Sequence, residues 1–116
     1  MRTDRELLEL AAKAAGYREF QYCEASGGLQ AIYVDDDDVG FWNPLSDDGD
    51  ALRLAVARWI EIRVFNGKAH AGKQDVFWCT EDCGIDPCAA TRRAIVRAAA
   101  EIAAHPKQHN GGGADE

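Results

Sequence analysis

The pair Asn66-Gly67 is the feature that most constrains the fold, because it lies between two segments that each have the pattern of a β-strand. This residue pair readily takes positive φ and so closes a two-residue turn between antiparallel strands. Ahead of the turn the side chains alternate in polarity, with Ile60, Ile62 and Val64 on one side and Glu61 and Arg63 on the other. The sequence therefore predicts an antiparallel hairpin at this point.

Three further stretches have the composition of strands. Residues 17–25 and 29–35 are rich in aromatic and β-branched side chains, and the break at Ser26–Gly28 suits a second hairpin. Residues 75–80, with the sequence DVFWCT, are predicted to form one more strand. Tight hairpins of this kind favour an antiparallel sheet with helices packed against it.

The first and last helices are predicted from the signals at their ends. The first has a capping box at its start and a glycine at its stop, which sets it at about residues 4–15 (Thr3, Glu6 and Gly16). The last has a capping aspartate, a first-turn proline and a proline beyond its end (Asp86, Pro87 and Pro106). The buried stripe of this last helix is expected to consist of Ile95, Ala98, Ala99 and Ile102.

A second helix is expected to begin at Ser46 or Asp47. Its buried face is predicted from the apolar spacing to hold Leu52, Ala55, Val56 and Trp59. Three carboxylates lie in its first turn, where each interacts with the positive end of the helix dipole by about 0.3–1 kcal/mol (Asp47, Asp48 and Asp50). Helix capping thus explains these three aspartates without a binding function.

Together these elements predict one α+β domain over residues 1–105 and a disordered polar tail over residues 106–116. We expect an antiparallel sheet of four or five strands sandwiched by three helices, in the order α-β-β-α-β-β-β-α. No apolar run approaches the roughly 20 residues of a membrane span, and the N-terminus lacks the apolar segment of a signal peptide. The sequence therefore favours a cytosolic protein with reduced cysteines.

The negative charge is concentrated in one part of the chain. The net charge is −7, and residues 19–52 contain nine acids and no lysine or arginine, which leaves +2 for the rest. Such an acidic surface repels nucleic-acid phosphates and anionic lipids, so direct binding to DNA or to a membrane is disfavoured. The run Asp35 to Asp38 is not explained by helix capping, because it lies in a loop.

Metal binding is weakly indicated. A calcium loop that starts at Asp35 has Gly40 at its sixth position, but Val39 occupies the fifth, which needs an oxygen ligand, and Ser46 the twelfth, which needs a glutamate. Cys79, Cys83 and Cys88 lie close together, and Cys23 or His70 would have to complete a zinc site. The spacing is irregular for zinc, and buried or strand cysteines explain the pattern more simply, so we predict no metal and no cofactor.

Catalysis has little support from the residues present. His70 is the one histidine within the expected fold that would act as a base, since His105 and His109 lie at or beyond the end of the last helix. Neither serine lies in a nucleophile motif, and no lysine follows Gly27-Gly28 into a helix as a phosphate loop requires. The sequence therefore predicts a protein that is not an enzyme.

Two segments carry a resemblance to a known group of proteins. FWNPLSDDGDALRLAV, residues 41–56, and ATRRAIVRAAAEIAA, residues 90–104, resemble small uncharacterised phage and prophage proteins that contain the phage ABA-sandwich domain. The chain is also distantly similar to the NinX proteins of lambdoid phages. The resemblance implies helices on either side of a sheet, and a phage or prophage gene expressed in the cytoplasm of a bacterial host. It implies no catalytic or binding residues.

The function expected from these observations is that of a non-catalytic protein-binding module. Its partner would be a basic host or phage protein, and its most specific form would be nucleic-acid mimicry in counter-defence. The predicted binding residues combine the acidic run with the adjacent aromatic pair: Asp35, Asp36, Asp37, Asp38, Phe41 and Trp42. The alternative is a small zinc protein, or an enzyme whose site the sequence does not reveal.

Overall fold

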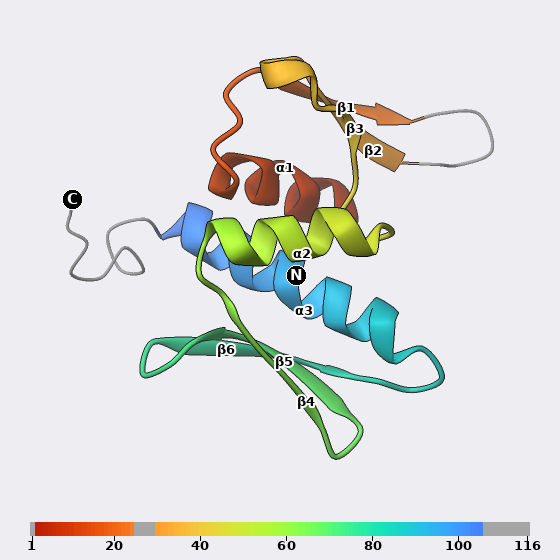
Figure 1. Ribbon diagram of the computed structural model, residues 1–116, viewed down its shortest axis with the longest axis vertical. Coiled ribbons are helices and arrows are strands. Elements are labelled where there is room, and N and C mark those ends of the chain that lie inside the picture. Colours follow the sequence, from red (N-terminus) through yellow and green to blue (C-terminus); the bar gives the residue numbers. More distant parts are fainter. Residues whose placement is uncertain (1, 25–29, 106–116) are drawn as a thin grey trace.

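The computed structural model describes residues 2–24 and 30–105, and at Asp37 the backbone alone. Within these residues, six strands form two separate three-stranded antiparallel sheets, and three α-helices lie between them (Figure 1). The molecule therefore has three layers, a sheet at each end and helices in the middle. The hairpin turn predicted at Ser26–Gly28 and the tail predicted after residue 105 lie outside the described residues.

The first helix, α1 (Asp4–Ala14), ends almost where the sequence predicted. The capping box is present: the Thr3 hydroxyl accepts from the Glu6 N–H at 3.1 Å, and the Glu6 carboxylate accepts from the Thr3 N–H at 2.7 Å. Gly16 follows the helix with φ of +94°, a conformation that glycine adopts without strain. Leu7, Leu8 and three alanines of α1 are buried against the rest of the core.

The first sheet consists of β1 (Phe20–Glu24), β2 (Gln30–Val34) and β3 (Gly40–Trp42), in that order. Its inner face packs on α1 and contributes Ile32, Val34 and Trp42 to the core. The indole of Trp42 lies edge-on to the Tyr17 ring, with centroids 5.4 Å apart. β3 was not predicted from the sequence, because a strand of three residues is too short to show a period.

The second helix, α2 (Asp48–Ala57), has Asp47 as its N-cap, as predicted, but its orientation differs from the prediction. Leu54, Ala51 and Ala55 are buried, whereas Leu52, Val56 and Trp59 are 59%, 66% and 85% exposed. The two small alanines allow α2 to approach α3 closely, and Leu54 fills the remaining space. The predicted burial of Leu52, Val56 and Trp59 is therefore wrong, and α2 carries an apolar stripe on its outer surface.

The second sheet consists of β4 (Glu61–Phe65), β5 (Lys68–Lys73) and β6 (Phe77–Asp82). The predicted Asn66-Gly67 turn is present, since both residues have positive φ, at 52° and 74°. β5 is the central strand, and its Ala69 and Ala71 are fully buried beneath the last helix.

That helix, α3 (Pro87–Ala104), begins with Asp86 as N-cap and Pro87 in the first turn, as the sequence predicted. The expected stripe of Ile95, Ala98, Ala99 and Ile102 is buried, with at most 3% of any side chain exposed. α3 packs on α1, on α2 and on both β5 and β6, so it lies at the centre of the core (Figure 1).

The fold class and the antiparallel pairing are thus confirmed, but the arrangement of layers is not. Instead of one sheet of four or five strands between helices, the chain forms two smaller sheets with the helices between them. One side of α3 covers the inner face of the second sheet, and its other side packs on α1, which covers the first sheet. Each sheet therefore buries one face only. In the described ranges, no helix has the length and apolar character that crossing a membrane requires.

Candidate functional site

The outer face of the first sheet carries exposed aromatic and acidic side chains. Tyr33 and Phe41 are paired across β2 and β3, with ring centroids 5.1 Å apart, and Phe41 is 70% exposed. Glu19, Asp35 and Asp38 are exposed on the segments that border these strands. Among the described residues these three carboxylates have no ion-pair partner, and we refer to the five residues together as the acidic surface.

The structure distributes the predicted binding residues between surface and core. Phe41 and the Asp35 and Asp38 side chains are at the surface, but Trp42 is only 3% exposed because it points to the inner face of β3. The Asp36 carboxylate accepts from the backbone N–H groups of Arg18 and Glu19, at 2.8 and 3.4 Å. Asp36 therefore holds the loop after β2 against the segment before β1, and Trp42 contributes to stability.

The aspartates at the start of α2 have structural roles. The Asp47 carboxylate accepts from the Asp50 N–H at 2.8 Å, as an N-cap does. Asp50 accepts from the Asn43 N–H at 2.9 Å and pairs with Arg53 at 2.7 Å. Asp48 pairs with Arg92 of α3 at 2.7 Å. Capping and ion pairs thus account for these carboxylates, and the acidic surface lies in the preceding strands.

A second surface, which the sequence analysis missed, is an apolar groove between α2, α3 and β4. The hollow has a volume of about 350 Å³, and its walls include Leu52 of α2, Ile62 and Val64 of β4, and Cys88 and Ile95 of α3. We call these five residues the apolar groove. The sequence did contain a signal for this groove, because α2 has apolar residues on two of its faces. Only one of these faces can pack against α3, so the other remains exposed.

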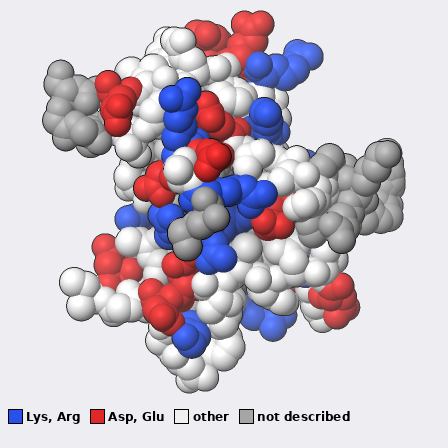
Figure 2. Space-filling model, turned by 180° about the vertical axis from the view of Figure 1, so that it is seen from behind, with Lys and Arg blue, Asp and Glu red and all other residues white. Residues whose placement is uncertain are grey.

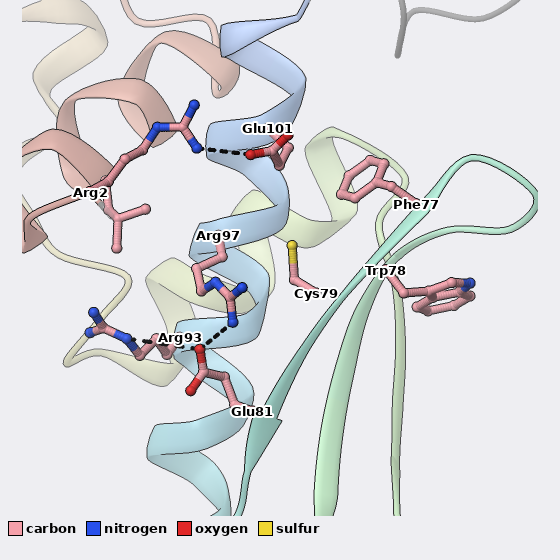
Figure 3. A pocket seen from close by; sticks show the side chains of 9 residues that line it. Arg2, Phe77, Trp78, Cys79, Glu81, Arg93, Arg97 and Glu101 are labelled. Carbon is pink, nitrogen blue, oxygen red and sulfur yellow. Dashed lines mark hydrogen bonds and ion pairs between the residues drawn. The ribbon is translucent and has the colours of Figure 1, made fainter.

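A larger hollow, of about 650 Å³, opens on the back of the helix layer, where Lys and Arg side chains gather (Figure 2). Arg2, Arg93 and Arg97 line it, and each of them has a carboxylate partner: Glu101 for Arg2, and Glu81 for both Arg93 and Arg97 (Figure 3). Asp4 also pairs with Arg93, at 3.0 Å. These ion pairs neutralise most of the positive charge and join α3 to β6 and to the segment before α1.

The three cysteines considered as metal ligands do not converge. Cys79 is buried beneath α3, Cys83 is partly buried, and Cys88 is exposed on α3. In the part of the chain that the structure describes, no three His, Cys, Asp or Glu side chains form a group able to hold an ion. Burial also raises the pKa of the Cys79 thiol above its usual range, which disfavours the reactive thiolate form.

His70 lies on the outer face of the second sheet. Its Nδ1 is 2.9 Å from the Thr80 hydroxyl, and its ring lies 5.1 Å from that of Phe65. Arg63 lies over the Trp78 ring at 4.8 Å on the same face. The neighbours of His70 are thus a hydroxyl, a ring and a stacked arginine, and none of the described contacts joins it to a carboxylate that would orient it as a catalytic base.

These surfaces define a small α+β protein with an acidic, aromatic face at one end and an apolar groove beside its helix layer. Comparisons of the chain with protein-family models, with curated proteins and with solved structures found no match.

Proposed function

We propose that this protein is a non-catalytic protein-binding module whose acidic surface binds a basic partner protein. The observation that carries the proposal is the combination of a 70% exposed Phe41 with exposed carboxylates around it. An aromatic side chain at the centre and charged groups at the rim is the usual composition of a protein interface. The resemblance to phage proteins supports a phage- or prophage-encoded accessory protein that acts in the cytoplasm of a bacterial host.

The charge distribution supports a basic partner in particular. Residues 19–52 contain nine acids and no lysine or arginine, and five acids remain when the four with structural contacts are set aside (Asp36, Asp47, Asp48 and Asp50). Complementary charges of this kind increase the rate of encounter and select against acidic partners. Phe41 supplies apolar area that becomes buried only when the partner arrives, and this burial adds affinity that does not depend on salt.

The test is capture of a partner from host lysate by the wild type and by a double variant, Asp35→Asn with Asp38→Asn. Both substitutions remove charge and preserve the fold, because asparagine tolerates the positive φ of 57° at Asp38 and Asp36 remains in place. We expect the partner to be lost with the double variant, to weaken as salt rises, and to weaken with Phe41→Ala.

The matched control changes the same number of charges elsewhere, with Glu9→Gln and Asp75→Asn. Both residues lie away from the first sheet's outer face, in α1 and in the turn after β5. Capture that is equal for the wild type and the double variant, and that persists in high salt, would show that the acidic surface is only solvated. Release of the captured protein by double-stranded DNA would support nucleic-acid mimicry as the specific form of the function.

A further inference from the structure

β4 is an edge strand, and its outer edge is open. It pairs with β5 on one side, and among the described residues no strand pairs with its other side. Native proteins usually protect such an edge with lysine, proline, a bulge or a covering element. β4, with the sequence Glu-Ile-Arg-Val-Phe, has no lysine or proline, its two charged side chains are of opposite sign, and four of its five residues are exposed. The backbone N–H and C=O groups on this edge are therefore available to another strand.

Apolar side chains are exposed directly beside this edge. Ile62 and Val64 lie on the same face of the sheet as the buried Ala69 and Ala71, with which they pair across β5. Unlike those alanines they are 37% and 50% exposed, because the groove between α2, α3 and β4 lies open beside them. Leu52 of α2 lines the same groove. An apolar patch next to an open edge is typical of an interface rather than of a solvated surface.

We propose that the occupant is a second copy of this chain, bound through antiparallel pairing of the two β4 strands about a two-fold axis at Ile62. In this register Ile62 faces Ile62 of the other copy, and the pairing is centred on residues 61–63, because the Ile60 N–H already donates to the Ala55 carbonyl at 2.9 Å. Glu61, which pairs with Arg63 of its own chain at 3.6 Å, also faces Arg63 of the other copy, so two further opposite-charge pairs form across the junction. Opposite charges directly across an antiparallel pair are stabilising and like charges are destabilising.

The other symmetric registers are less favourable. Side chains directly opposite each other must lie on the same face of the sheet, so the axis can only fall at a residue. An axis at Glu61 sets two glutamates against each other, and an axis at Arg63 sets two arginines against each other. An axis at Val64 leaves Glu61 without a partner on the other strand. The axis at Ile62 is thus the one that makes β4 complementary to itself in both charge and hydrophobicity.

The same axis accounts for the apolar stripe on α2. A two-fold axis perpendicular to the sheet keeps the same face of both copies on the same side, so both α2 helices lie over the junction. Leu52 lines the same groove as Ile62 and Val64, so the Leu52 side chains of the two copies lie on the same side of the joined sheet and help to close the apolar groove. The second sheet of one copy (β4, β5 and β6) and that of the other then form one six-stranded sheet, with neither β4 edge exposed.

The decisive experiment uses two charge reversals, Glu61→Arg and Arg63→Glu, and sedimentation velocity over a range of concentrations. The wild type should reach twice the monomer mass. Each single reversal makes both cross-strand pairs repulsive and should weaken self-association at least tenfold. An equimolar mixture of the two single variants, or the double variant Glu61→Arg with Arg63→Glu, restores both attractive pairs and should recover the dimer. Recovery in the mixture also proves that each single variant is folded.

Two exposed apolar residues give a second, independent comparison. Leu52→Glu should weaken the dimer at least tenfold, whereas Val76→Glu, at a residue with similar exposure in the turn after β5, should leave it unchanged. A wild type that stays monomeric at its highest soluble concentration overturns the proposal. So does a dimer that tolerates both single charge reversals, because it must form through another surface.

Discussion

At Gly72 a hydrogen atom in place of a side chain is what allows β5 and β6 to pair. A Cβ at this position would lie 2.1 Å from the Phe77 carbonyl oxygen and 2.9 Å from the Trp78 Cα, both of them backbone atoms that cannot move aside independently. Gly49, by contrast, lies in the first turn of α2, and a Cβ there would meet only side-chain atoms, the flexible end of Arg53 at 3.2 Å and the Asp47 carboxylate at 3.3 Å.

We therefore expect Gly72→Ala to lower the free energy of unfolding by more than about 2 kcal/mol, since the backbone clash forces β5 and β6 apart. Gly49→Ala should change it by no more than about 1 kcal/mol, because alanine favours the helix and the arginine can shift. Urea denaturation followed by circular dichroism measures both. Similar losses for the two variants would contradict the close approach at Gly72.

Single residues also show where the candidate site was predictable. Phe41 and the exposed aspartates were found because aromatic and charged residues that are adjacent in sequence remained adjacent at the surface. Trp42 was assigned to the surface with Phe41, but successive residues in a strand point to opposite faces. Because the strand at residues 40–42 is too short to show a period, the separation of the two aromatic side chains was not predictable.

At the scale of the element, α2 is held by a face that periodicity could not identify. Residues 51, 54 and 55 and residues 52, 55 and 56 both fit a helical repeat, and the second set contains more large side chains. The first set is buried because its two alanines allow close packing against α3. The period of the apolar residues predicts that a helix forms and that either of two faces could be buried. Packing against the neighbouring helix α3 determines which of the two faces is buried.

This assignment predicts a difference between two leucines separated by one residue. Leu54→Ala should lower the free energy of unfolding by about 2–5 kcal/mol, because the side chain is 2% exposed and its loss leaves a cavity. Leu52→Ala should cost less than about 0.5 kcal/mol at concentrations where the protein is monomeric. Chemical denaturation of dilute protein tests the pair, and a larger cost for Leu52→Ala would mean that α2 is turned the other way.

At the scale of the whole molecule, α3 connects the layers. It contacts both other helices and the second sheet, while α1 carries the first sheet. The sequence predicted each of the three helices and five of the six strands, but it did not predict their layering. The layering depends on which apolar faces of helices and sheets pack together although they are far apart in the sequence. The signals for hairpins and helices contain only local information.

Because each sheet packs on a helix of the one helix layer, and α1 packs on α3, we expect the chain to unfold as one unit. The amides in the middle of α3 should exchange with solvent only through global unfolding, and so should those of β2 and β5. Hydrogen exchange measured at increasing denaturant gives the free energy of opening for each element. Markedly lower values for β2 than for α3 would show that the first sheet opens independently.

The three tryptophans are distributed one to each layer: Trp42 in β3, Trp59 just after α2, and Trp78 in β6. Their exposed fractions are 3%, 85% and 37%, so they meet three different polarities. Indole emission moves to longer wavelength as water contacts the ring, and the three signals should therefore be separable by replacing two tryptophans at a time with phenylalanine. Contact near the β4 edge would shift the emission of Trp59 to the blue and leave that of Trp42 unchanged. The chain thus contains its own optical label for each layer, and the place at which a partner binds can be read without attaching a dye.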